Sequence, residues 1–166
     1  MKKLFLILFV ALLLGGCSLA GQSTINTNTN TNVPSNTNLN YGASTLNLSN
    51  QNLTKVPDYV FNMTNLEELN ISNNKITGAI QSQINQLKNL KVLNASNNLM
   101  TGVPAEIGQL TNLQVLDLSN NQLTGLPNEL GNLQNLKTFN ISGNNYSTSD
   151  LNIITQKLST RVNIIK

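Results

Sequence analysis

The sequence predicts an α/β solenoid, a short arc of about five stacked repeats of 23–24 residues. Apolar pairs separated by one residue recur from residue 43 onward, and successive pairs lie 23, 24, 23 and 23 residues apart. One unit of this length cannot bury its own apolar face, so neighbouring units must stack and share one core. The pairs are Leu46/Leu48, Leu69/Ile71, Leu93/Ala95, Leu116/Leu118 and Phe139/Ile141.

Each repeat begins with a predicted strand over its apolar pair, in which alternate residues are buried. An asparagine follows, and we expect its side chain to turn inward and bond backbone groups that the bend would leave unpaired. These inner asparagines are Asn74, Asn98, Asn121 and Asn144, with Gln51 at the same position in the first repeat. Other core positions are Ala43, Leu66, Leu90, Leu113 and Leu136 before the pairs, and Leu53, Ile76, Met100, Leu123 and Tyr146 after the asparagines.

The second half of each repeat predicts a turn and then a short helical or 3-10 segment. Glycines are expected to ease the turn, prolines suit the first turn of such a segment, and acids suit its N-terminus, where the backbone dipoles favour negative charge. The glycines are Gly78, Gly102 and Gly125, the prolines Pro57, Pro104 and Pro127, and the acids Asp58, Glu106 and Glu129.

These residues follow the pattern L-x-x-L-x-L-x-x-N-x-L, and the chain resembles the leucine-rich repeat family over residues 43–166. Segments such as "LTGLPNELGNLQNL" are similar to repeats of bacterial surface proteins and plant receptors. The second repeat, "ITGAIQSQINQLKNL", has one extra residue and matches the plant-receptor form, except that Gln81 stands in place of proline. The resemblance implies parallel strands on a concave face, short helical segments on a convex face, and ligand binding at the concave face.

The last stretch, "STSDLNIITQKLSTRVNIIK", departs from the repeat and predicts a C-terminal cap over residues 146–166. Ser149 or Asp150 is expected to cap a helix. A membrane-binding amphipathic helix is the disfavoured alternative, because the segment is short and carries little basic charge. The residues expected to face the core are Leu151, Ile154 and Leu158 in the helix and Val162 and Ile164 in a last strand.

The first 16 residues have the layout of a secretory signal, with two lysines, an apolar run and small residues. The stretch "LGGCS" at 14–18 resembles the lipobox of a bacterial lipoprotein; an ordinary signal peptide that ends near a cysteine is the alternative. The resemblance implies that Cys17 becomes the first mature residue and carries lipid, so the membrane is one partner. Ser18, in place of an aspartate, favours the outer membrane or cell surface of a bacterial envelope.

Residues 17–42 form the predicted link between the lipid and the repeats, which occupy residues 43–166. This link is an Asn/Thr-rich, low-complexity stretch without apolar periodicity, so we expect a disordered tether. A flexible chain of this length spans on the order of 25–30 Å. Its repeats are also compatible with sugar attachment or with aggregation.

Composition excludes several functions. Removing Lys2 and Lys3 with the leader leaves eight basic and seven acidic side chains, so nothing favours nucleic acid. The chain has no histidine and one cysteine, which rules out a Cys/His zinc site and histidine-activated nucleophiles. Glu68 and Asp117 would lie roughly 10 Å apart on the concave face, at the far limit for a glycosidase pair. We therefore expect no catalytic residue, no metal and no cofactor.

The strand residues between the leucines are the candidate ligand contacts. A first row comprises Thr45, Glu68, Val92, Val115 and Thr138, and a second row comprises Asn47, Asn70, Asn94, Asp117 and Asn140. The second row is either a polar recognition strip or a consequence of a composition rich in asparagine. A serine row at 49, 72, 96, 119 and 142 is a candidate for loop structure instead. The predicted site is Glu68, Asn70, Val92, Asn94, Val115, Asp117, Thr138 and Asn140.

These observations favour a lipid-anchored cell-surface module, monomeric in its repeat domain, that binds an unknown protein or glycan or serves in adhesion. The concave rows lack Trp, Tyr and Arg, the usual residues of tight interfaces. Two alternatives remain at this stage. One is a self-associating structural lipoprotein of the envelope or matrix, and the other is a surface that orders ice or mineral.

Overall fold

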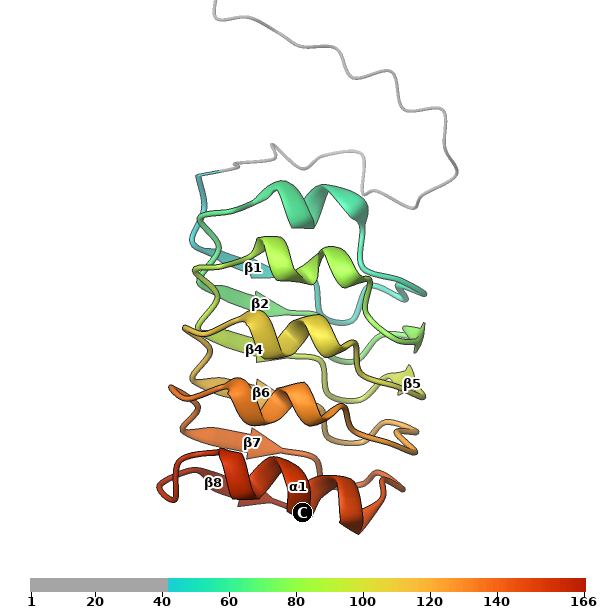
Figure 1. Cartoon of the computed structure of the whole chain (residues 1–166). Coiled ribbons are helices and arrows are strands. Elements are labelled where there is room, and N and C mark those ends of the chain that lie inside the picture. The colour runs from blue at the N-terminus through green and yellow to red at the C-terminus, as the bar shows by residue number, and fades with distance from the viewer. Residues whose placement is uncertain (1–41) are drawn as a thin grey trace, which may run out of the picture. The chain divides into compact units, whose positions relative to one another are not determined.

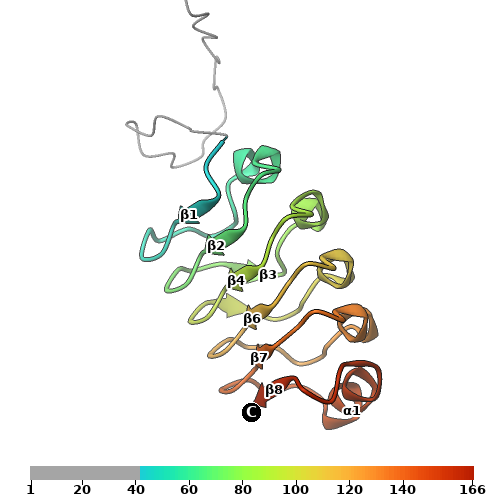
Figure 2. The ribbon, with the colours of Figure 1, turned by 90° about the vertical axis from the view of Figure 1, so that its left-hand side faces the viewer.

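The computed structural model describes residues 42–166, which form one curved stack of repeats (Figures 1 and 2). Figure 2 shows strands along one side of the stack and helical segments along the other. The predicted leader, Cys17 and nearly all of the tether lie outside the described residues. Among residues 42–166, no helix is long and apolar enough to cross a membrane.

Six strands form one parallel sheet in the order β1-β2-β4-β6-β7-β8. The register aligns equivalent core residues, so Leu69 lies between Leu46 and Leu93. This arrangement confirms the predicted solenoid arc, with β8 as the last strand expected from the C-terminal segment. The strands are β1 (Thr45–Asn47), β2 (Glu68–Asn70), β4 (Val92–Asn94), β6 (Val115–Asp117), β7 (Thr138–Asn140) and β8 (Asn163–Ile165).

The convex side consists of short 3-10 helices. A second, two-stranded sheet lies between the large sheet and these helices along the chain. Four 3-10 helices stack on one another in the same order as the strands (Figure 1). These segments are η1 (Asp58–Asn62), η2 (Ser82–Gln86), η3 (Ala105–Gln109) and η4 (Asn128–Asn132), and the small sheet pairs β3 (Thr77–Gly78) with β5 (Leu99–Met100).

Proline occupies the residue just before three of these helices, one position earlier than a first-turn proline. The acids Asp58, Glu106 and Glu129 lie in the first turns, as predicted. Gln81 takes the proline position in the second repeat with φ −62° and ψ 145°, close to the −71° and 139° of Pro104. Its side chain also donates a hydrogen bond to the Val56 carbonyl at 2.6 Å.

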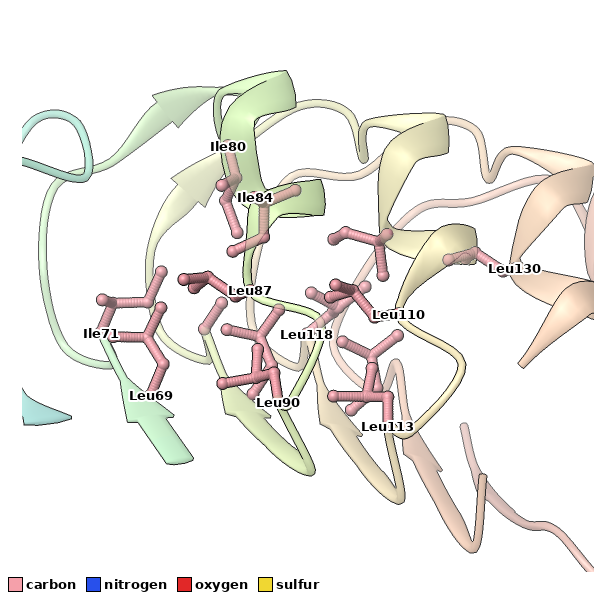
Figure 3. Close-up of a cluster of buried hydrophobic side chains, with 14 of the residues drawn as sticks. Leu69, Ile71, Ile80, Ile84, Leu87, Leu90, Leu110, Leu113, Leu118 and Leu130 are labelled. Atoms are coloured by element: carbon pink, nitrogen blue, oxygen red, sulfur yellow. The ribbon is translucent and has the colours of Figure 1, made fainter. Parts of the chain in front are cut away.

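The core lies between the six-stranded sheet and the convex helices (Figure 3). Leucine and isoleucine from successive repeats interleave there, and each predicted apolar pair is buried except Leu46 at the N-terminal end. Burying one such side chain contributes about 1.5–3 kcal/mol, so this column of apolar residues is the main source of stability.

The inner asparagines bond backbone groups of two successive repeats, which confirms their predicted role. Asn98 accepts the backbone N–H of Ile76 at 3.1 Å and donates to the carbonyls of Ile71 at 3.0 Å and Ala95 at 3.1 Å. The first repeat differs, because the Gln51 side chain is exposed and its backbone N–H donates instead to Asn74 Oδ1 at 2.9 Å.

The three glycines predicted to ease the turn differ in backbone conformation. Only Gly78 among them has positive φ, at 68°. The bend is made earlier, by the residue that precedes each inner asparagine. Asparagine tolerates the left-handed conformation better than most residues, because its short side chain bonds locally, and Gly143 takes the position in the last repeat. The asparagines at this bend are Asn50 (φ 60°), Asn73 (54°), Asn97 (55°) and Asn120 (52°).

The C-terminal helix α1 (Thr148–Lys157) and strand β8 extend the stack by one layer. Leu151, Ile154 and Leu158 are buried as expected. The predicted caps are wrong, because Ser147 precedes the helix and makes no side-chain cap bond. Asp150 points instead to the preceding repeat, where its Oδ2 accepts the Leu126 N–H at 3.1 Å. The last full repeat thereby gains an acceptor from the segment that follows it.

Candidate binding surface

All eight predicted contact residues project from β2, β4, β6 and β7 between buried core residues. The register places Glu68, Val92, Val115 and Thr138 side by side in the first row. The second row continues in the same way from Asn70 to Asn140. Strand β8 extends both rows with residues that we did not predict, because Asn163 pairs with Thr138 and Ile165 pairs with Asn140.

The second row is built into the turns that follow the strands. Each side chain accepts the backbone N–H of the serine two residues later, so the serine row belongs to these turns. Ser72, Ser96 and Ser119 are buried as a result. The bonds are Ser49 to Asn47 at 3.0 Å, Ser72 to Asn70 at 3.0 Å, Ser96 to Asn94 at 3.1 Å, Ser119 to Asp117 at 2.9 Å and Ser142 to Asn140 at 3.2 Å.

Asp117 makes the same two turn bonds, to a serine N–H and hydroxyl, as its neighbours Asn94 and Asn140, and it adds one more. Its Oδ1 also accepts the Ser119 hydroxyl at 2.6 Å, and its Oδ2 accepts the Asn140 amide at 3.2 Å. Both carboxylate oxygens therefore have partners within the protein. The one acid in this row holds the local fold, and only part of its side chain is exposed.

The first row has no comparable structural task. Glu68 is exposed, and its carboxylate makes no hydrogen bond or ion pair with any residue from 42 to 166. Val92 and Val115 are half-buried neighbours on adjacent strands, and Thr138 continues the row. An exposed acid thus lies beside a small apolar patch.

A flanking row, one residue before the first row, was missed by sequence reasoning. Lys91 Nζ forms a 2.8 Å ion pair with Glu67 Oε2, and Lys137 Nζ donates to Gln114 Oε1 at 2.8 Å. The ion pair is partly exposed and contributes little to stability. The row shares the period of the other two, and that period is the signal that would have found it.

An outer asparagine row was also missed, at the position just before the leading leucine of each repeat. Its side chains donate to carbonyls of the preceding repeat and so join neighbouring layers. The bonds are Asn89 to Thr64 at 3.0 Å, Asn112 to Lys88 at 2.9 Å and Asn135 to Thr111 at 2.8 Å. Hydrogen bonding at several fixed positions in the repeat therefore accounts for much of the asparagine in this domain.

The chain belongs to the leucine-rich repeat family, because the family model for a leucine-rich repeat region matches residues 10–164. This fold is typical of protein-binding modules and is generally a non-enzymatic scaffold. Within residues 42–166, no group of three or more His, Cys, Asp and Glu side chains is placed to hold a metal ion.

Several solved structures are similar to this chain, while the search of curated proteins found no match. A leucine-rich repeat protein of Leptospira interrogans is 41% identical with a TM-score of 0.63, over 68% of this chain and 28% of that one. The ectodomain of the Arabidopsis thaliana receptor kinase GASSHO1/SCHENGEN3, in complex with CASPARIAN STRIP INTEGRITY FACTOR 2, is 36% identical with a TM-score of 0.52, over 55% and 11%.

A plant ice-binding protein is 31% identical with a TM-score of 0.51, over 55% of this chain and 30% of that one. This chain therefore spans less than a third of the length of each of these three proteins. The relatives support the fold and a general capacity for binding, and they leave the ligand to be argued from the surface itself.

Proposed function

We propose that this protein is a bacterial cell-surface binding module, anchored through lipid on Cys17, that recognises a protein or glycan with the first row of its concave face. The family and the receptor complex with CASPARIAN STRIP INTEGRITY FACTOR 2 support a binding role. One observation of this chain carries the proposal. The second row is bonded into turns, whereas Glu68, Val92 and Val115 are available to a ligand.

The expected affinity is modest. Six strands present a face about 25–30 Å wide, which is small beside a standard interface of about 800 Å² per partner. The described strands also expose no Trp, Tyr or Arg side chain at this face. Many copies on one membrane would strengthen weak single-site binding through avidity.

A binding experiment on the full chain tests the concave face directly. The double variant Val92→Ser/Val115→Ser should lose capture of ligands from a glycan array and from surface extracts, because it removes the apolar patch. A matched control, Thr101→Ala/Thr124→Ala, changes two exposed residues in the segments that lead from the strands to the convex helices, and it should retain capture. Equal binding by both variants, with both folded, would contradict the proposal.

The lipid anchor is tested by Cys17→Ser. Metabolic labelling with a palmitate analogue should mark the wild-type chain in the membrane fraction and leave the variant unlabelled and released. Labelling that persists in Cys17→Ser would reject modification at this residue. The same fractions show whether residues 17–42 act as a tether, because deleting residues 24–36 should preserve the anchor and reduce access of an antibody to the repeats.

Ice binding is a second candidate function, favoured by the similar plant ice-binding protein and by one row of side chains. Thr54, Thr77, Thr101 and Thr124 are all exposed in the segments that lead from the strands to the convex helices, one in each of the first four repeats. This row differs from the concave face, where Glu68 and Lys91 interrupt any regular array. Thermal hysteresis that disappears in Thr77→Lys/Thr101→Lys would support the idea, and no hysteresis in the wild type would end it.

A further inference from the structure

We propose that the concave face selects an extended peptide segment with a basic side chain at one end, an acidic side chain at the other and apolar side chains between them. This inference rests on the proposed binding function and specifies its partner. The features that define the segment are the exposed carboxylate of Glu68, the apolar pair Val92 and Val115, and the ammonium group of Lys137.

The charges of this face divide into those already paired and those that are not. Glu67 and Lys91 pair with each other, and Asp117 is bonded to Ser119 and Asn140. Besides Asp117, whose carboxylate is bonded to neutral groups, two charges of the described strands and of the residue before each lack an ion-pair partner. These are Glu68, which has no polar side-chain contact, and Lys137, whose ammonium group meets only the neutral amide of Gln114.

The spacing of the two charges matches a short extended peptide. Glu68 is on β2 and Lys137 immediately precedes β7, so three strand spacings separate them, roughly 14 Å. A peptide rises about 3.3 Å per residue when extended. Four to five residues crossing the strands would therefore bring opposite end charges to Glu68 and Lys137 together.

The surface between the charges suits the rest of such a segment. Val92 and Val115 are half-buried and adjacent, so two apolar side chains could cover them. The amide nitrogens of Asn70 and Asn94 have no partner among the described residues, because their turn bonds use Oδ1. These donors lie beside the valines and can bond peptide carbonyls, which favours a peptide over a purely ionic ligand.

The chain's own Asn/Thr tract does not meet these requirements. Residues 19–42 carry no charged side chain, so they cannot neutralise Glu68 or Lys137. A neutral glycan likewise leaves both charges unpaired. The occupant that the surface fits is a segment of another protein that carries both signs of charge.

Four immobilised seven-residue peptides test the inference against the full chain purified in detergent. They share two central leucines and differ at the ends, which are basic and acidic, both basic, both acidic, or both neutral. The wild type should prefer the mixed peptide, because each exposed charge contact changes binding by about two- to fivefold. Val92→Ser should weaken binding to all four.

Charge reversals give the decisive result. The preferences expected for these variants are the same for either direction of peptide binding. Glu68→Lys leaves positive charge at both ends of the patch, so preference should move to the acidic peptide. Lys137→Glu should move preference to the basic peptide. The matched control Lys75→Glu reverses an exposed charge outside the face and should keep the wild-type preference.

Unchanged preference in both Glu68→Lys and Lys137→Glu would overturn the inference. It would also be overturned if no peptide binds the wild type. In that case, ligand capture that still depends on Val92 and Val115 would leave the proposed binding function intact, whereas loss of that dependence as well would reject both.

Discussion

The inner asparagines and the second concave row use similar side chains for different purposes. Asn121 is buried and bonds four backbone groups from two repeats. Asn94, four residues before the inner asparagine Asn98, is half-exposed and bonds only Ser96 within its own turn. The difference shows that residue type alone does not distinguish side chains that hold the fold from side chains that are exposed on the concave face. The number of buried backbone groups that depend on a side chain does.

Asn121→Ala should produce the largest change that separates the two groups. It leaves the Met100 N–H without its acceptor in the core, whereas the carbonyls of Ala95 and Leu118 each lose one of two donors and keep the other, from Asn98 and Asn144. One unsatisfied buried group costs about 1–3 kcal/mol, and the bonds to the carbonyls are lost as well, so we expect a loss of about 2–4 kcal/mol in the free energy of unfolding. Urea denaturation of the full chain measures it, and a loss below about 1 kcal/mol would contradict the assigned role.

Asn97→Ala should have the next largest effect, through the backbone. Asn97 has φ 55°, where an ordinary L-residue costs about 1–2 kcal/mol. The side chain also accepts a bond from Asn120 at 3.1 Å. Asn97→Gly is the control, since glycine adopts this conformation freely and should recover most of the loss. Equal destabilisation by both changes would show that the side-chain contact matters more than the backbone angle.

Asn94→Ala should cost less than either change, about 0.5–1.5 kcal/mol, the usual net contribution of one hydrogen bond. The turn bonds to the Ser96 N–H and hydroxyl are lost, but the site is half-exposed and water can replace them in part. Thermal denaturation compares this variant with Asn121→Ala. A cost equal to that of Asn121→Ala would contradict the distinction between the inner asparagines and the second concave row.

Asp117→Asn should have the smallest effect, within about 0.5 kcal/mol, as for most surface substitutions. The amide keeps the acceptor for the Ser119 N–H, and the other repeats use asparagine at this position. Peptide binding should change little as well, because both Asp117 oxygens already have partners within the protein. A large loss of binding with unchanged stability would make Asp117 a ligand contact.

The fold could be predicted from local pattern because stacking repeats must place equivalent residues in register. The period alone placed Leu116 and Leu118 in the core and identified Asn121 as a side chain that bonds backbone groups. The candidate site was located less well. The predicted rows do share one face, but the period could not distinguish Val115, which is available, from Asn94, whose Oδ1 is bonded into a turn.

Errors arose where a side chain acts on another layer of the stack. Asp150 was expected to cap its own helix, yet it bonds Leu126 of the preceding repeat. Gly102 and Gly125 were expected to ease the turn, yet neither has positive φ, and the left-handed residues are Asn97 and Asn120 at the preceding bend. Each case depends on which neighbouring group remains unpaired after packing, and sequence spacing does not carry that information.

The sequence by itself determined the repeat length, the buried columns and the absence of histidine-based chemistry. Those properties follow from periodicity and composition, because apolar residues at a constant spacing can be buried only by stacking. The tertiary structure alone decided which polar side chains are committed to the fold. Hydrogen bonds form between layers that are 23–24 residues apart, so only the assembled stack shows that Glu68 and Lys137 are left for a partner.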